Sequence, residues 1–173
     1  IWSGVTVSLA VTTAQNTGMA GGIDTVTGFE NLIGSNYDDS LTGSSASNVI
    51  TGGAGMDTLT GGLGADRFVY RSLGDTNSWS TNEKITDFSS AEGDKIDLSG
   101  VAAATGVAFF FNATSSSLTG SGTPGEIVFN PGDPMVSYMP PYLMIDIDGN
   151  TMADMIISLT GVTSFSASDL ILS

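Results

Sequence analysis

Glycine and aspartate recur at fixed intervals in the middle of this chain. Residues 52–60 (GGAGMDTLT) and 61–69 (GGLGADRFV) share one pattern, with glycine at the first, second and fourth positions and aspartate at the sixth. A large apolar residue, Leu59 or Phe68, stands at the eighth position. Glycine loses more backbone entropy on folding than any other residue. A repeat with so many glycines therefore predicts a regular stack of tight turns.

The same nine-residue phase extends toward the N-terminus. Counting back from Phe68, the apolar position falls on Leu59, Ile50, Leu41 and Leu32. The acidic position, two residues earlier in each unit, holds Asp66, Asp57, Asn48, Asp39 and Glu30. Residues 21–27 (GGIDTVT) read as a shortened unit ahead of these. The earlier units have lost glycines, as expected of terminal repeats that act as caps.

Each unit predicts one short strand and one turn. Three residues such as 58–60 form a strand whose middle side chain points inward, and the six residues before them form the turn. Two units close one coil, and successive coils stack as parallel strands about 4.8 Å apart. We therefore expect an all-β fold, a right-handed parallel β-roll (β-solenoid). This geometry places Asp39 beside Asp57 on one edge and Asn48 beside Asp66 on the other.

Stacked carboxylates on the two edges require a counter-ion. Without one, neighbouring acids repel each other. Ca²⁺ accepts six to eight oxygen ligands at about 2.3 to 2.6 Å, and tight glycine turns present backbone carbonyls beside each carboxylate. The sequence therefore predicts several Ca²⁺ ions bound along the roll.

Composition excludes several other functions. The 173 residues include 18 acidic and 4 basic side chains, for a net charge of -14, and no histidine or cysteine. Such a chain repels polyanions, so nucleic acid is not an expected partner. The absence of histidine and cysteine removes imidazole catalysis, thiolate nucleophiles and the usual zinc ligands. No apolar run is long enough for membrane insertion. We expect a non-catalytic piece of a longer protein.

The tandem repeats carry a family resemblance. Residues 52–69 match the pattern G-G-x-G-x-D-x-U-x, with U a large apolar residue, at every fixed position. The chain thus resembles the RTX (hemolysin-type) calcium-binding nonapeptide-repeat proteins. Residues 72–101 resemble the segment that follows the repeats in serralysin-type secreted metalloproteases. The resemblance implies that Asp75, Glu83 and Asp94 complete the last calcium sites, although Glu83 stands where the family usually has aspartate.

The candidate metal ligands are of two kinds. Side-chain ligands are the residues at the acidic position and the three acids that follow the repeats: Glu30, Asp39, Asn48, Asp57, Asp66, Asp75, Glu83 and Asp94. Turn residues offer backbone carbonyls: Gly28, Ser35, Tyr37, Ser44, Ala46, Gly52, Gly53, Gly55, Gly61, Gly62 and Gly64. For Asp87 and Asp97, a polar cap at a strand end and a metal contact are both open.

The remainder of the chain predicts an antiparallel, β-sandwich-like capping region. It contains three β-rich runs, at 125–129, 142–147 and 155–161, with a hairpin that turns at 148–150. The acidic stretch DIDGN is interpreted as a plain hairpin turn, because its glycine comes too early for an EF-hand. Asp133-Pro134 is interpreted as a turn. We divide the chain into N-terminal covering strands (1–22), the roll (23–70), a calcium-completing cap segment (71–100) and the C-terminal antiparallel region (101–173).

The resemblance also implies a function. A bacterial type I secretion system, with its ABC transporter, would export the chain, and Ca²⁺ outside the cell would fold it and support an upstream passenger domain. The last residues, 166–173 (SASDLILS), form a final strand, an uncleaved export signal, or both. One alternative is the C-terminal portion of a secreted hydrolase, a serralysin-like metalloprotease or a lipase. Another is a glycan-binding or adhesive module, which the excess of acids disfavours.

Overall fold

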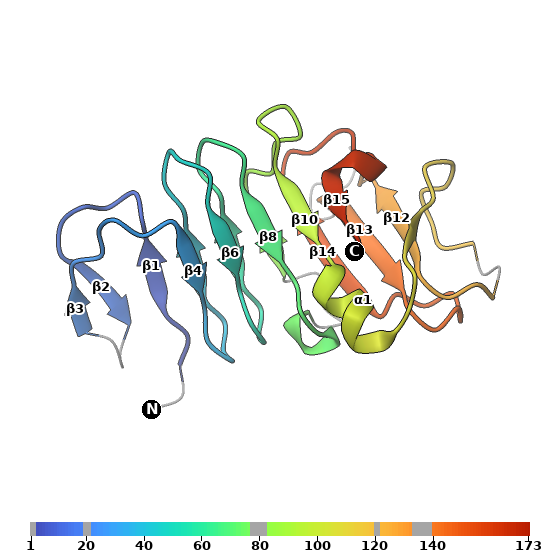
Figure 1. Ribbon diagram of the computed structural model, residues 1–173, viewed down its shortest axis with the longest axis horizontal. Helices are drawn as coiled ribbons and strands as arrows, with labels where there is room; N and C mark the ends of the chain where they lie inside the picture. The colour runs from blue at the N-terminus through green and yellow to red at the C-terminus, as the bar shows by residue number, and fades with distance from the viewer. Residues whose placement is uncertain (1–2, 19–21, 77–82, 120–121, 133–139) are drawn as a thin grey trace.

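Short parallel strands in two sheets form the first half of the structure. The computed structural model describes residues 3–18, 22–76, 83–119, 122–132 and 140–173. Successive three-residue strands alternate between the two sheets (Figure 1): β4 (Asn31–Ile33), β5 (Ser40–Thr42), β6 (Val49–Thr51), β7 (Thr58–Thr60) and β8 (Arg67–Val69). Each strand is only long enough to point one central side chain into the space between the sheets.

The register of these strands confirms the predicted coil. β5 pairs in parallel with β7, so that Leu41 lies opposite Leu59. β6 pairs in parallel with β8, so that Ile50 lies opposite Phe68. Strands two units apart are therefore neighbours within one sheet, and the predicted parallel β-roll is confirmed.

The N-terminal strands depart from the predicted repeat phase. β1 (Thr6–Ser8) pairs in parallel with β5 and so occupies the place beneath it. β2 (Gln15–Gly18) and β3 (Gly22–Asp24) form a separate antiparallel pair. The prediction that residues 21–27 continue the roll as a shortened unit is wrong for the strand within it. Gly18 and Gly22, with φ of 112° and 85°, flank this reversal in a region that glycine occupies without strain.

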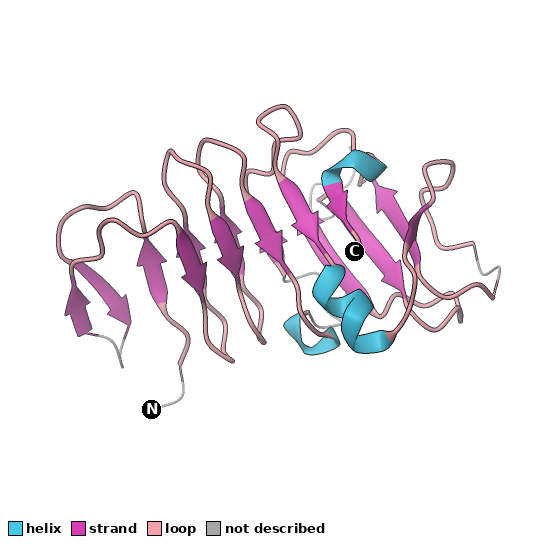
Figure 2. Cartoon of the chain, viewed as in Figure 1, coloured by secondary structure: helices cyan, strands magenta, loops and turns pink. Residues whose placement is uncertain are grey.

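The C-terminal region continues both sheets of the roll. The larger sheet has the order β1-β5-β7-β9-β14-β13-β12-β11, and the smaller has the order β15-β10-β8-β6-β4. Their further strands are β9 (Lys84–Ile85), β10 (Lys95–Asp97), β11 (Phe110–Phe111), β12 (Glu126–Asn130), β13 (Tyr142–Asp146), β14 (Met155–Leu159) and β15 (Leu170–Ile171). β12, β13 and β14 are antiparallel, which confirms the predicted hairpin. The roll and the residues that follow it, here together called the cap (71–173), form one continuous body (Figure 2).

In the described parts of the chain, three short helical elements interrupt the β-structure. They are η1 (Leu73–Asp75), α1 (Ser99–Thr105) and η2 (Ala167–Asp169). The helix α1 ends at Gly106, which has a left-handed φ of 72° and donates its N–H to the carbonyl of Ala102 at 2.8 Å. The fold is mostly β, as predicted.

Two sequence predictions are not tested by the structure. The division of the chain into four segments stays a prediction, and Asp133-Pro134 lies outside the described residues.

A single column of apolar side chains fills the roll. Leu41, Ile50, Leu59 and Phe68 are each at most 1% exposed. The column continues into the cap, where the ring of Phe68 lies 6.4 Å from that of Phe88. Each such side chain stabilises the fold by about 1.5 to 3 kcal/mol when fully buried.

Leu59→Ala is expected to lower the free energy of unfolding by about 2 to 5 kcal/mol, because it opens a cavity in this column. Leu63→Ala in the next unit is the matched control, since Leu63 is 61% exposed, and it should change stability by less than about 0.5 kcal/mol. Denaturant unfolding at saturating Ca²⁺ measures both variants. Equal losses would show that the apolar column is not the core of the roll.

Candidate metal centre

Asp57 and Asp66 lie on the two edges of the roll. Each is the last residue of its turn (52–57 or 61–66) and directly precedes a strand, and the two residues are 0% and 1% exposed. Asp57 Oδ1 accepts a 2.8 Å hydrogen bond from the backbone N–H of Asp39, and Asp66 Oδ1 accepts one of the same length from Asn48. Both donors lie 18 residues earlier, which is one coil. The predicted stacking on the two edges is confirmed.

Within the part of the chain that the structure describes, the second carboxylate oxygen of each aspartate has no hydrogen-bond partner. Oδ2 of Asp57 and Oδ2 of Asp66 are both buried. Each faces the first glycine of its own turn, since a Cβ added at Gly52 would lie 2.1 Å from Asp57 Oδ2 and one at Gly61 would lie 2.3 Å from Asp66 Oδ2. A buried oxygen without a donor costs about 1 to 3 kcal/mol, and more when charged. The two oxygens therefore fit a hard cation such as Ca²⁺.

Glu83 and Asp94 repeat the arrangement one coil further along. Each accepts a hydrogen bond from the backbone N–H of the aspartate before it in the stack, at 3.0 and 2.8 Å. Their other oxygens have donors within the protein. The Tyr70 hydroxyl donates to Glu83 Oε1 at 3.1 Å, and the Ser89 N–H donates to Asp94 Oδ2 at 2.8 Å. Sequence reasoning missed Tyr70, whose position directly after a strand carries no metal-site signal.

Burial raises the carboxyl pKa values along both edges. Loss of solvent is the largest cause, and it raises the pKa of Asp57 to about 7, that of Asp66 to about 6 and that of Glu83 to about 8. Backbone hydrogen bonds oppose the rise, and neighbouring carboxylates add to it. The pKa of Asp94 is raised for the same first reason. A divalent cation would offset this cost, because it favours the charged carboxylates.

The other predicted side-chain ligands lie in different settings. Asp39 and Asn48 are buried and accept hydrogen bonds from a serine of their own turn. Asp75, in η1, accepts from the backbone N–H of Arg71 at 2.6 Å. The side chain of Glu30 is exposed, although its backbone carbonyl accepts a 3.0 Å hydrogen bond from Asn48 Nδ2. The structure thus brings these residues to the predicted edges, and their role as ligands stays a prediction.

The turn residues proposed to offer carbonyls stack in register from coil to coil. Gly53 lies against Ser35, Gly55 against Tyr37, Gly62 against Ser44 and Gly64 against Ala46. A Cβ at Gly53 would approach the Ser35 carbonyl oxygen to 2.1 Å. The close backbone approach explains the glycines at these positions. Gly28 differs, because a Cβ there would meet nothing within 4 Å.

Asp87 and Asp97 both make capping contacts. The two oxygens of Asp87 accept hydrogen bonds of 2.9 Å from the backbone N–H groups of Gly61 and Gly62. Asp97 pairs with Arg67 and accepts from the backbone N–H of Ser99 at 2.9 Å. These contacts support the reading of both residues as polar caps.

A second acidic cluster lies in the β13–β14 hairpin. Carboxylate oxygens of Asp146, Asp148 and Asp154 lie within 4.8 Å of one another. Asp146 accepts from two backbone N–H groups of the loop, at 2.7 and 3.0 Å, and Asp154 accepts from that of Ile147 at 2.7 Å. The predicted hairpin is confirmed, but no local pattern indicates that Asp154 would join the other two acids.

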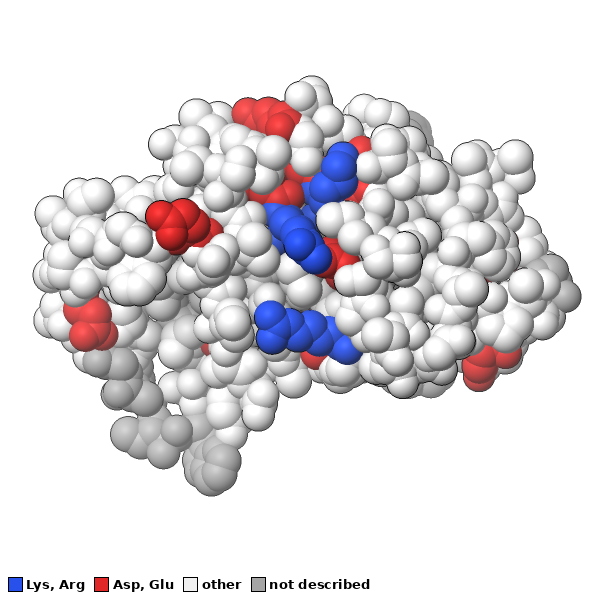
Figure 3. Space-filling model, in the orientation of Figure 1, with Lys and Arg blue, Asp and Glu red and all other residues white. Residues whose placement is uncertain are grey.

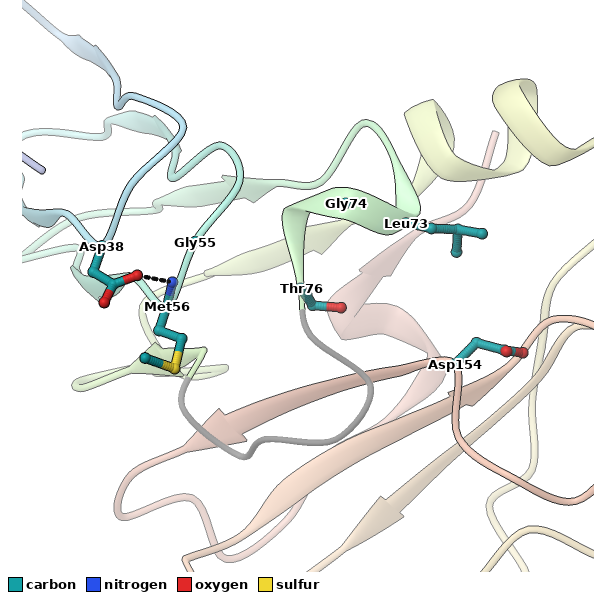
Figure 4. Close-up of a pocket in the computed structure, with 7 residues that line it drawn as sticks. All are labelled: Asp38, Gly55, Met56, Leu73, Gly74, Thr76 and Asp154. Atoms are coloured by element: carbon teal, nitrogen blue, oxygen red, sulfur yellow. Dashed lines mark hydrogen bonds between the residues drawn. The ribbon is translucent and has the colours of Figure 1, made fainter. Parts of the chain in front are cut away.

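A surface pocket of about 530 Å³ lies beside the turn at residues 52–57 (Figure 4). Its described lining consists of Asp38, Gly55, Met56, Leu73, Gly74, Thr76 and Asp154. Asp38 Oδ1 accepts from the backbone N–H of Met56 at 2.8 Å (Figure 4). The pocket therefore places the carboxylates of Asp38 and Asp154 near the apolar side chains of Met56 and Leu73. It has no histidine or cysteine for catalysis, since the chain contains neither.

Basic side chains gather on one face of the smaller sheet. Figure 3 shows lysine and arginine near the centre of this face, in the region where Figure 1 shows β8 and β10. Arg67 on β8 and Lys95 on β10 are opposite each other in the pairing register.

In the described parts of the chain, no helix is both long enough and apolar enough to be a candidate for a membrane span.

Comparison with known families agrees with this geometry. The family model described as "Peptidase M10 serralysin C terminal" matches residues 16–172. The chain belongs to this family. Its members' C-terminal domain is a non-catalytic region of a secreted protease family, and RTX-type β-rolls of this kind typically bind Ca²⁺.

A solved structure also resembles this serralysin C-terminal domain. The AlgE6R3 subunit of the Azotobacter vinelandii mannuronan C5-epimerase matches with a TM-score of 0.47 and 20% sequence identity, over 83% of this chain and 77% of that one. No curated protein matches the chain.

Without divalent cations, the folded roll is expected to lose stability as the pH rises. Because the folded-state pKa values of Asp57, Asp66 and Glu83 lie above the ordinary 3.8 and 4.5, protonation favours the fold. This contribution is fully present below the ordinary values and is lost as the pH passes through about 6 to 8. Thermal melting in chelator should therefore give a lower midpoint near pH 8 than near pH 5.

The double variant Asp57→Asn/Asp66→Asn is the control for this pH dependence. It removes two of the carboxyl groups with a raised pKa and keeps the size of the side chains. Its midpoint should depend less on pH. A midpoint of the parent chain that climbs with pH in chelator would contradict the assignment.

Proposed function

We propose that this chain is a calcium-binding β-roll module that folds on Ca²⁺ binding after type I secretion. In this role it stabilises an upstream passenger domain and supports its export. The observation that carries the proposal is the pair of buried oxygens without donors, Asp57 Oδ2 and Asp66 Oδ2. The membership of the chain in the serralysin C-terminal family supports the same function.

The chemistry of the site favours Ca²⁺ over other metals. The available donors are carboxylate and backbone carbonyl oxygens, which hard cations prefer. The chain has no histidine or cysteine, so the nitrogen and sulfur ligands that favour zinc or copper are absent. Ca²⁺ tolerates an irregular shell of six to eight oxygens, whereas Mg²⁺ demands near-octahedral geometry. A stack of turns that supplies many carbonyls suits the larger ion.

Coupling between the metal and folding follows from mass action. A ligand that binds only the folded state stabilises it by about 2.7 kcal/mol per site at 100 times its dissociation constant. In a cytosol with scarce free Ca²⁺, the folding equilibrium of a chain with a net charge of -14 would shift toward the unfolded state, which could be threaded through an exporter. At the higher Ca²⁺ concentration outside the cell, the occupied sites would hold the folded roll.

The C-terminal tail would be read by the ABC transporter before folding. In the folded chain, β15 lies at the edge of the smaller sheet and pairs only with β10 among the described strands. Because β15 pairs on one side alone, the roll can form before the tail is paired, and the tail can stay accessible until then. The tail can thus serve as an export signal first and as a strand afterwards.

A second candidate function is the C-terminal portion of a secreted metalloprotease. The family match over residues 16–172 favours it, because that family is named for the C-terminal part of serralysin peptidases. In that case the passenger is a catalytic domain, and this chain contributes stability and export without touching the substrate. The two candidates share the same calcium chemistry.

Adding Ca²⁺ to the chelated chain is expected to raise its β-sheet content and its melting midpoint. Two sites at 100 times their dissociation constants would together add about 5 kcal/mol. Circular dichroism during a Ca²⁺ titration measures the change, and a parallel Mg²⁺ titration is the control. A spectrum and a midpoint that do not respond to Ca²⁺ would rule out the proposed function.

Gly52→Ala is expected to weaken Ca²⁺ binding at least tenfold, or to abolish the Ca²⁺-dependent gain in stability. The added Cβ would lie 2.1 Å from Asp57 Oδ2 and would displace the oxygen that is proposed to contact the ion. Gly74→Ala is the matched control, because its nearest neighbour would be at 3.5 Å. Isothermal titration calorimetry compares the two variants. Identical affinities would place the ion away from this turn.

A further inference from the structure

The turns of the roll are of two kinds, distinguished first by their backbone. In the turns at 52–57 and 61–66, the second and fourth positions are glycines with φ between 97° and 130°. In the turns at 34–39 and 43–48, the same positions hold Ser35, Tyr37, Ser44 and Ala46. Among the described residues other than glycine, positive φ occurs only at Thr151. The first pair, here called glycine turns, therefore has a different backbone path from the second pair, here called serine turns.

The serine turns supply hydrogen-bond donors to their own acidic position. Ser35 donates to both oxygens of Asp39, from its backbone N–H to Oδ2 and from its hydroxyl to Oδ1 at 3.0 Å. Ser44 donates to Asn48 Oδ1 from its backbone N–H at 2.7 Å and from its hydroxyl at 3.3 Å. In each turn the serine Oγ also accepts a 3.1 Å hydrogen bond from the N–H two residues later. The carboxylate or amide is thus satisfied without a cation.

The side-chain amide of Asn48 makes a further hydrogen bond. Its Nδ2 donates to the backbone carbonyl of Glu30 at 3.0 Å, a carbonyl that lies 18 residues earlier on the same edge. The Asn48 amide N–H thus reaches the Glu30 carbonyl oxygen of the preceding coil. An aspartate at position 48 would present a carboxylate oxygen there instead, and a cation would be needed to bridge that oxygen and the Glu30 carbonyl.

The glycine turns lack these internal donors. Among the described residues, none donates a hydrogen bond to Oδ2 of Asp57 or of Asp66. The N–H of Gly62, at the position equivalent to Ser35 and Ser44, donates instead to Asp87 Oδ2 at 2.9 Å. The second position of this turn thus directs its donor away from Asp66.

The cap repeats the serine arrangement where no nonapeptide is present. Ser72 donates from its hydroxyl to Asp75 Oδ1 at 2.6 Å and from its N–H to Asp75 Oδ2 at 3.3 Å, and its Oγ accepts from the N–H of Gly74 at 3.2 Å. The chain therefore closes the turns at Asp39, Asn48 and Asp75 in one way, with hydrogen bonds from a nearby serine.

We propose that Ca²⁺ binds at the glycine turns 52–57 and 61–66, and that a serine replaces the cation in the turns 34–39 and 43–48. This inference rests on the proposed calcium function and narrows it. Asp57 and Asp66 hold ions, and Asp39 and Asn48 are structural. The first coil of the roll closes its turns with hydroxyl groups, and the ion-dependent part begins at residue 52.

Counting bound ions in point variants of the full chain tests this division. Equilibrium dialysis against Ca²⁺ alone gives the number of ions per molecule, and circular dichroism at saturating Ca²⁺ confirms folding. Asp57→Asn and Asp66→Asn should each bind one ion fewer than the parent chain. Asp39→Asn is the matched control, in the same turn position one coil earlier, and should bind as many ions as the parent.

A gain of one ion provides the complementary test if Asp57→Asn or Asp66→Asn does not fold. The double variant Ser35→Gly/Tyr37→Gly removes the serine donors and restores glycine at the second and fourth positions of the turn that ends at Asp39. It should bind one ion more than the parent. The same ion count as the parent would overturn the inference, as would the loss of an ion in Asp39→Asn. A parent chain that binds no Ca²⁺ would instead refute the proposed function itself.

Discussion

The half-satisfied carboxylates of Asp57 and Asp66 are the constraint on which the roll depends. One oxygen of each holds two coils in register through a 2.8 Å hydrogen bond to a backbone N–H 18 residues earlier. The other oxygen is buried, and no described residue donates to it. Burying an unpaired charge costs several kcal/mol. The same side chain therefore aligns the stack and makes its stability depend on a counter-charge.

Glu83 extends this constraint from the roll to the cap. Its Oε2 accepts a hydrogen bond from the backbone N–H of Asp57 at 3.0 Å. Its backbone carbonyl accepts a hydrogen bond from the backbone N–H of Ser158 on β14 at 2.9 Å. One residue thus touches both the glycine turn and the antiparallel sheet. Since β9 pairs with β7 on one side and with β14 on the other, ordering of the roll and ordering of the cap favour each other.

Periodicity revealed the roll because each repeat position has one structural role. A nine-residue step places Leu41 opposite Leu59 and Asp39 beneath Asp57, so phase alone predicts these contacts. Pairing outside the repeats has no such phase, and β1 took the place expected for residues 21–27. The Tyr70 contact to Glu83 and the approach of Asp154 to Asp146 depend on how separate segments fold back, which local pattern does not specify.

The counter-charge for the buried acids does not come from the basic residues of the chain. Within the described parts of the structure, the one ion pair joins Arg67 to Asp97, on the outer side of the smaller sheet. Two neutralising agents are left for Asp57 and Asp66, namely protons and metal ions. The raised pKa values, about 7 and about 6, leave much of the charge in place at neutral pH, so protons alone are insufficient. A divalent cation carries enough charge and accepts the oxygen ligands on offer, so the acidic composition and the glycine turns favour the same partner.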